Sequence, residues 1–169
     1  MKLILKIMGG LLAASAAVAA DFTQEQLKAR FYYDLGPNTV DVTSCPQEQQ
    51  ENYKLFAVMC SQCHTLARPI NSPMVSRADW KRFIARMHIK TKQMSENDFT
   101  AAQAKQILDF MVYDSQARKI AGKTAFDAQA AELKRLFGEV KIARARQQQE
   151  SDQKKVRPYG DSTNATSRP

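Results

Sequence analysis

The five residues Cys60-Ser61-Gln62-Cys63-His64 constrain this chain more than any other feature of its sequence. They form the pattern C-x-x-C-H, in which two thiols lie three residues apart and an imidazole follows directly. This spacing lets each thiol add to one vinyl group of a haem and directs the adjacent histidine at the iron. We therefore predict one covalently attached haem c, held by Cys60 and Cys63, with His64 as an axial ligand.

Three other structures can use the same residues. A tetrahedral zinc site needs four ligands, which Cys60, Cys63, His64 and His88 would supply, but the adjacency of Cys63 and His64 strains that arrangement. A thioredoxin-like redox pair is expected after a strand and within a βαβ pattern, whereas this motif lies among helical stretches. A structural disulfide between the two thiols is the third alternative. The sequence favours haem over all three.

The first twenty residues have the pattern of an export signal. Lys2 and Lys6 precede an uncharged run, which is shorter than the ~20 apolar residues needed to cross a bilayer. Small residues directly before Asp21 fit a cleavage site. We predict that residues 1–20 are a signal peptide and that the mature chain is periplasmic, without a transmembrane span. A retained anchor is the alternative, and association with a membrane complex stays open.

The charge of the chain is unevenly distributed. The formal net charge is +8, but residues 21–114 hold 11 basic and 11 acidic residues. Residues 115–169 hold 12 basic and 6 acidic residues, so most of the excess lies in the C-terminal part. That part has few aromatic residues among its cations, and the protein is expected outside the cytoplasm, so we expect no nucleic-acid partner.

Apolar residues recur at helical spacing throughout, and no strand-like alternation competes with them, so we predict an all-α fold. The pattern predicts helices over 22–35, about 46–60, 77–89, from Ser95 onward, and about 126–149, with a loop over 65–77. Ser44 and Gln47 suggest a capping box for the second helix, and Gly122 should interrupt the chain before the last one.

The apolar stripes of these helices define the predicted core. Their members are Tyr53, Phe56 and Cys60; Trp80, Phe83, Ile84 and Met87; Ala104, Ile107, Leu108, Met111 and Val112; and Phe126, Ala130, Leu133, Phe137 and Val140. We expect an N-terminal helical arm (21–44), a helical domain around the haem (45–116), a C-terminal helical extension (117–150) and a disordered tail (151–169).

The residues around the motif resemble a known family. The matching segments are Gln50-x-x-Tyr53-x-x-Phe56-x-x-x-Cys60-Ser61-Gln62-Cys63-His64, Asn71-Ser72-Pro73, Trp80-x-x-x-Ile84-x-x-Met87 and Ile107-x-x-Phe110-Met111. Over about residues 46–114 they resemble small monohaem class I c-type cytochromes, and most closely the small cytochrome subunits of sulfite dehydrogenases. The arm and the C-terminal extension are not part of that pattern.

The resemblance implies a small cytochrome c-like domain whose haem forms part of the core. It implies that the helix ending at Cys60 crosses the closing helix near Phe110 and Met111. It also implies an electron carrier rather than an enzyme: with His and Met on the iron, no position is open to substrate. The alternative is a haem enzyme or sensor with an open iron position, of the peroxidase-like or gas-binding kind.

The sixth iron ligand has four candidates downstream of His64. Met87 is preferred, because it shares an apolar helix face with Trp80 and matches the methionine of the resembling family. Met94 is the second choice, since it is expected in the loop before the helix capped by Ser95. Met74 and His88 follow, although His88 points about 100° away from Met87 around the helix.

Other site residues are expected around the haem. Arg68, Arg77 and Trp80 are candidates to contact the haem propionates. A backbone carbonyl of Pro69 or Pro73 is expected to accept a hydrogen bond from the second ring nitrogen of His64.

Two features remain outside the haem site. Cys45 is left over, either as a partly buried apolar residue or as a thiol for an intermolecular disulfide. The expected partner is another redox protein, docked through the basic C-terminal extension. The alternative is that this helix packs back on its own domain.

Overall fold

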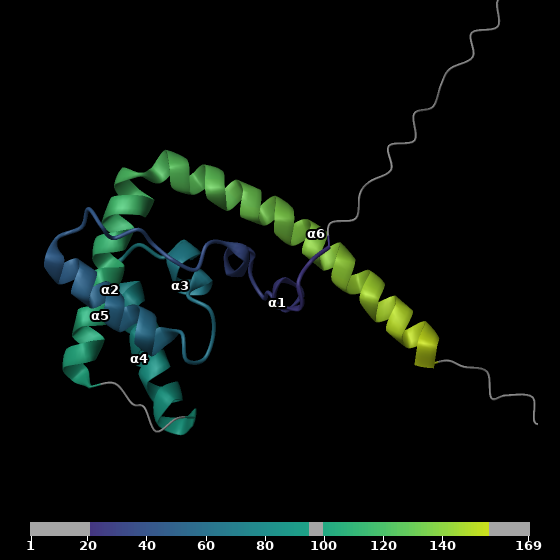
Figure 1. Ribbon diagram of the computed structural model, residues 1–169, viewed down its shortest axis with the longest axis horizontal. Helices are drawn as coiled ribbons and strands as arrows, with labels where there is room; N and C mark the ends of the chain where they lie inside the picture. Colours follow the sequence, from purple (N-terminus) through teal and green to yellow (C-terminus); the bar gives the residue numbers. More distant parts are fainter. Residues whose placement is uncertain (1–20, 95–99, 156–169) are drawn as a thin grey trace, which may run out of the picture.

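The chain folds into helices alone over the residues that the structure describes. A computed structural model gives residues 21–94 and 100–155, with no strand among them, and confirms the all-α class (Figure 1). The predicted signal peptide, residues 1–20, lies outside this part. The elements are α1 (Gln24–Leu27), η1 (Tyr32–Leu35), α2 (Gln47–Cys60), α3 (Ala67–Asn71), α4 (Arg77–Met94), α5 (Ala101–Asp114), η2 (Ser115–Ala121) and α6 (Lys123–Lys155).

Helix α2 spans the predicted residues, but its cap differs from the prediction. The capping box between Ser44 and Gln47 is wrong, because Pro46 occupies the N-cap and offers no side-chain acceptor to the first turn. The preceding segment is held instead by the side-chain amide of Gln50, which donates to the carbonyl oxygen of Cys45 at 2.9 Å. The helix therefore still has a fixed start.

The arm is less helical than predicted. A single helix over 22–35 is wrong, because α1 and the 3-10 helix η1 are separate. Between them, the carboxylate of Asp34 accepts hydrogen bonds from the backbone N–H groups of Arg30 (2.8 Å) and Phe31 (3.1 Å). Asp34 also pairs with Arg68 of α3 at 2.7 Å. Contacts with α3 therefore hold the arm in this broken form.

Two expectations between α2 and α5 are corrected. The predicted loop over 65–77 contains the short helix α3, in which Pro69 lies in the first turn, where a missing N–H is tolerated. Helix α5 begins later than Ser95, which lies outside the described residues. Its N-cap is Thr100, whose hydroxyl accepts from the backbone N–H of Gln103 at 3.2 Å in a capping box.

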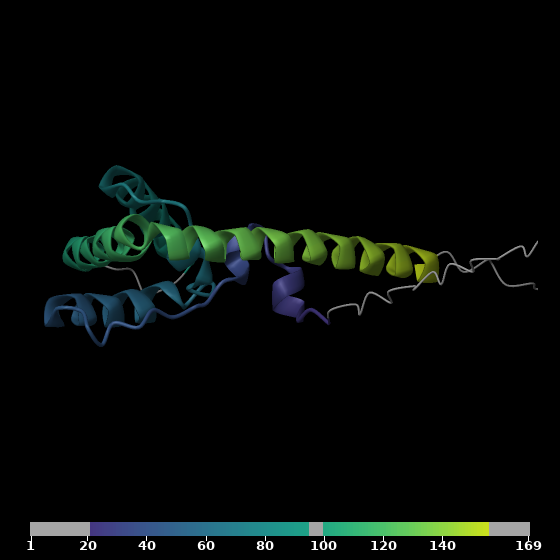
Figure 2. The same ribbon diagram turned by 90° about the horizontal axis from the view of Figure 1, so that it is seen from above.

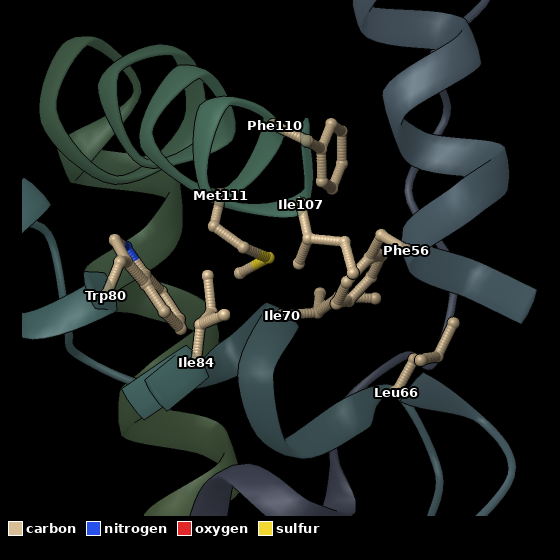
Figure 3. Packing of buried hydrophobic residues seen from close by; sticks show 8 residues of the cluster. All are labelled: Phe56, Leu66, Ile70, Trp80, Ile84, Ile107, Phe110 and Met111. Carbon is tan, nitrogen blue, oxygen red and sulfur yellow. The ribbon is translucent and has the colours of Figure 1, made fainter. Parts of the chain in front are cut away.

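The core forms where α2 and α5 cross, as the resemblance implies. Tyr53 and Phe56 of α2 lie against Phe110 of α5, with ring centroids 5.1 Å and 5.4 Å apart. Helices α3 and α4 supply the remaining sides (Figure 3). The buried cluster consists of Phe56, Leu66, Ile70, Trp80, Ile84, Ile107, Phe110 and Met111. The predicted apolar stripes of α2, α4 and α5 are confirmed as the faces that meet here.

The π-helical turn η2 belongs to the core rather than to the C-terminal extension. Its Lys119 is only 4% exposed, and the Nζ atom donates to the carbonyl oxygen of Ser72 at 2.8 Å. The same nitrogen lies 4.9 Å from the centroid of the Trp80 ring. The boundary expected after residue 116 is therefore better placed at Gly122, which ends the turn before α6.

Helix α6 is longer than predicted. It continues to Lys155, so residues 151–155, for which disorder is predicted, are helical. Residues 156–169 lie outside the described residues. Leu133 and Val140 of its predicted apolar stripe are buried, and the other three members of that stripe are half-buried. The far end of the helix projects beyond the rest of the molecule (Figure 1).

The first part of α6 packs against the arm. Arg144 donates to the carbonyl oxygens of Leu27 (2.8 Å) and Ala29 (2.7 Å), and the ammonium of Lys134 lies 5.2 Å from the ring centroid of Tyr32. Figure 1 and Figure 2 agree that α1 lies alongside α6. Of the two alternatives for the extension, packing on its own chain therefore describes the residues up to Arg144.

Candidate functional site

The C-x-x-C-H motif starts at the last residue of α2. Its first thiol, Cys60, lines a small apolar cavity of about 20 Å³ inside the helical core. The other lining residues come from α2, α3, α4 and α5: Phe56, Pro69, Phe83, Ile84, Met87, Ile107 and Met111. Cys60 and Met87, predicted as a haem attachment and an iron ligand, therefore line one cavity although they lie 27 positions apart in the sequence.

Burial raises the pKa of the Cys60 thiol to about 12, and the neighbouring Cys63 acts in the same direction. Cys60 is consequently a protonated thiol at neutral pH. Redox-active C-x-x-C pairs instead depend on a thiol whose pKa is lowered, because the thiolate is the nucleophile. The environment of Cys60 thus disfavours the thioredoxin-like alternative, and both cysteines of the motif are free thiols here.

Cys63 and His64 do not line the cavity that Cys60 lines. They line an open hollow of about 680 Å³, together with Glu25, Asn38 and Thr39 from the arm. Nothing in the sequence indicates that the arm reaches the motif, because its residues lie far upstream and carry no periodic signal that points there. The arm therefore forms one wall of the site.

The ring of His64 is oriented by a backbone carbonyl. Its Nδ1 lies 2.7 Å from the carbonyl oxygen of Thr65, a contact in which Nδ1 carries the proton and donates. The tautomer leaves Nε2 with its lone pair, the arrangement that metal-binding histidines use. The expected contact with Pro69 or Pro73 is wrong: the carbonyl of Pro69 accepts from Ser72 at 3.1 Å instead.

The donor types are those of a covalently attached haem, and the structure divides them between two hollows, with Cys60 and Met87 in one and Cys63 and His64 in the other. Two free thiols, an imidazole with a lone pair on Nε2 and the thioether of Met87 lie around the end of α2. The cavity itself is far smaller than the roughly 300 Å³ of ordinary cofactor pockets. Phe83 and Met87 are only partly buried on α4, so this side of the cavity lies nearest the surface.

The structure separates the other candidates for the sixth ligand. His88 lines a different hollow, of about 330 Å³, between α4 and α5, as its position on the helix predicts. Met74 is partly buried, and its carbonyl oxygen accepts from Lys119 at 3.3 Å. Met94 is the last residue of α4 rather than part of a loop, and its side chain lies outside what the structure describes.

The three candidate propionate contacts already have protein partners. Arg68 is paired with Asp34, and Arg77 donates to Asp109 at 2.8 Å. The indole N–H of the fully buried Trp80 donates to the hydroxyl of Ser115 at 2.9 Å. Because tryptophan has a single donor, Trp80 has none left for a propionate. Both arginines keep further N–H groups, and Arg77 has the more exposed side chain, at 55%.

Cys45 is a partly buried free thiol in the segment just before α2. It contacts the hydroxyl of Tyr113 on α5, and this hydrogen bond raises the pKa of the tyrosine. An intermolecular disulfide through Cys45 stays a prediction. The contact with Tyr113 links the segment just before α2 to α5.

The described residues hold neither a cluster of metal ligands nor a helix suited to a bilayer. Within residues 21–94 and 100–155, no three His, Cys, Asp or Glu side chains are grouped so that they could share a metal ion. The zinc alternative would need Cys60, Cys63, His64 and His88 together, but His88 faces a different hollow. None of the helices in this part of the chain has the length and apolar character to cross a membrane.

Comparisons with family models, curated proteins and solved structures found no match for this chain.

Proposed function

We propose that the chain is a periplasmic electron-transfer protein with one haem c, attached through Cys60 and Cys63 and ligated by His64 and Met87. The observation that carries this proposal is the cavity that Cys60 and Met87 share at the end of α2. When bound, the haem iron would supply a centre that gains and loses one electron. The likeness to class I cytochromes, and to the subunits of sulfite dehydrogenases in particular, belongs to the same proposal.

The protein's own residues would do three things at such a centre. The carbonyl of Thr65 holds the proton on Nδ1 of His64 and keeps Nε2 directed as a ligand. Aromatic and aliphatic side chains of α2, α3 and α5 exclude water from the cavity. Met87 would fill the sixth position, which closes the iron to substrates and raises its potential relative to a second histidine. Electron transfer without substrate chemistry follows from those roles.

The first experiment asks whether haem is attached. Expression with export and cytochrome c maturation should give a protein whose mass exceeds that of the mature chain by one haem. Its reduced pyridine adduct should have the absorption spectrum of two thioether-linked vinyl groups. Cys60→Ser and Cys63→Ser should each abolish the double linkage, whereas Cys45→Ser should leave the spectrum unchanged. A full-length protein that matures without haem would refute the proposal.

The second experiment identifies the sixth ligand and separates the carrier from a haem enzyme or sensor. Met87→Leu keeps the side-chain volume and removes the sulfur, so it should lower the reduction potential and allow carbon monoxide to bind the reduced haem. Met94→Leu is the matched control and should do neither. If the wild-type protein itself binds carbon monoxide readily, the iron has an open position and the enzyme or sensor alternative is correct.

The partner in this proposal is another redox protein, which exchanges one electron with the haem. The sequence alone favours the basic C-terminal extension as the surface that docks it. The part of α6 beyond Arg144 projects from the molecule and is exposed, so it stays available for such a contact. A location in the periplasm, with or without a membrane complex, depends on the signal peptide and is tested by fractionating cells.

A further inference from the structure

The balanced charge of residues 21–114 conceals a strong separation of charge. Helix α4 alone holds six basic residues and one acidic residue, a net charge of +5. The rest of residues 21–114 holds five basic and ten acidic residues, a net charge of −5. The sequence does not show this separation of charge until the bounds of α4 are known. Within residues 21–114, one strongly basic helix therefore stands among segments that are acidic on balance, and residues 115–169 add a further net charge of +6.

The cations of α4 lie on its exposed side. Lys81, Arg86 and Lys90 are exposed, and no acidic side chain within the described part of the chain pairs with them. Arg82, one turn before Arg86, is 75% exposed and pairs with Asp79 of its own helix. A large apolar side chain on the same helix, Ile89, is also exposed, at 58%, between Arg86 and Lys90 in the sequence. An apolar centre within a charged rim is the usual composition of a protein–protein contact.

Helix α6 is a weaker candidate for the same role. It has eight basic and five acidic residues, a net charge of +3, and most of its cations have partners within the chain. Two of them form ion pairs within the helix, Lys123 with Asp127 and Arg135 with Glu132 and Glu139. Two lie over aromatic rings, Lys134 over Tyr32 and Lys141 over Phe137. Arg144 donates to backbone carbonyls of the arm. The carboxylates paired with Lys123 and Arg135 partly neutralise the charge of α6, and the ring and carbonyl contacts hold three more of its cations against the rest of the chain.

The basic face of α4 also lies close to the proposed redox centre. Met87 follows Arg86 directly and precedes Lys90 by less than one turn, and it lines the cavity that Cys60 shares. An α-helix with its side chains is about 10 Å across. A partner that contacts the outer side of α4 is thus separated from the cavity by one helix.

We propose that the exposed face of α4 formed by Lys81, Arg82, Arg86, Ile89 and Lys90 is the docking surface for an acidic redox protein. That the partner is a redox protein rests on the proposed function. That it docks on α4 rests on the charge and exposure of this helix. The positive charge concentrated on α4 attracts an acidic partner before contact, and electrostatic steering of this kind raises association rates by about 10- to 1,000-fold at low salt.

The test uses full-length reduced protein and the anionic oxidant ferricyanide. Arg86→Glu/Lys90→Glu is compared with Lys154→Glu/Lys155→Glu at the exposed end of α6, a matched control with the same change in net charge. We expect the α4 variant to react about tenfold more slowly at 10 mM salt, and the control less than twofold. Both differences should vanish at 1 M salt, where the Debye length is about 3 Å.

A second measurement does not depend on haem. Backbone amide NMR shifts are recorded while an octaglutamate peptide is added, and the largest shifts should map to α4. If the largest shifts map to α4 and the protein proves to carry no haem, α4 is still the surface that binds an acidic partner, and the proposed function is wrong. Equal slowing by both variants, a larger effect of the α6 variant, or shifts spread over α6 would overturn the assignment to α4.

A membrane is the other class of acidic surface. Vesicles of phosphatidylglycerol are therefore sedimented with the wild-type protein and the α4 variant. Binding that the α4 variant loses, without peptide-induced shifts in α4, would mean that the helix meets lipid, and would overturn the protein partner.

Discussion

Replacing Lys119 with methionine is expected to remove about 3 kcal/mol of pH dependence from the stability of the protein between pH 7 and pH 9.5. The Nζ atom of this buried lysine donates to the carbonyl oxygens of Ser72 (2.8 Å), Met74 (3.3 Å) and Pro69 (3.4 Å). It also lies over the ring of Trp80. Methionine fills a similar volume without the charge or the donors.

The magnitude follows from the pKa of the lysine in the folded and unfolded chain. Burial lowers the pKa of Lys119 from 10.5 to about 7; Asp114 opposes this shift and Arg118 adds to it. Between these values the unfolded chain holds more protons than the folded chain, so the free energy of unfolding rises with pH. The rise amounts to about 3 kcal/mol from pH 7 to pH 9.5 and levels off below pH 7.

Urea denaturation of the protein at pH 7, 8 and 9.5 measures this rise. All other titrating groups are common to both proteins, so the difference between wild type and Lys119→Met isolates the lysine. Lys123→Met is the control, because Lys123 is exposed and pairs with Asp127 at the surface. Parallel pH profiles for wild type and Lys119→Met would refute the reasoning, as would a wild-type stability that falls relative to the variant as the pH rises.

Two further predictions concern the arm. Gly36→Ala would place a Cβ in steric conflict with the side-chain amide of Asn71, so urea denaturation should show a free energy of unfolding lower by about 1–3 kcal/mol. In the control Gly138→Ala, the added Cβ meets nothing within 4 Å and should not lower the stability. Equal losses of stability in the two variants would contradict this account. Arg144→Met removes both hydrogen bonds from α6 to the arm, so amide hydrogen exchange should accelerate in α1 and remain unchanged in α5, and unchanged protection of α1 would show that α6 does not hold it.

The helices that meet in the core could be predicted from local pattern alone. Helix α5 is an example: Ile107, Phe110 and Met111 recur at helical spacing, and they are the residues that the structure buries. Burial of an apolar face is the main source of helix stability in a folded chain, so such a face is visible in the sequence. The C-x-x-C-H motif is equally local, because its meaning depends on five consecutive residues.

The errors arose where distant residues determine the backbone. Helix α3 contains Pro69 and spans five residues, too few for a periodic signal. It is held by contacts such as that of Asn71, whose amide donates to the carbonyl of Pro37 at 2.8 Å. The break in the arm depends in the same way on Asp34, which must find Arg68 across the fold. Neither pairing follows from the spacing of the residues.

The sequence by itself determined the helical class, the core faces and the motif that predicts a haem. Only the tertiary structure decided that Cys60 and Met87 line one cavity and that residues of the arm line the hollow next to Cys63 and His64. It also decided that Lys119 is buried. The physical reason is the distance along the chain between the residues that determine each feature. A helix and its apolar face are set by neighbours within one or two turns, whereas a cavity, a buried charge and a charged face depend on which elements pack together.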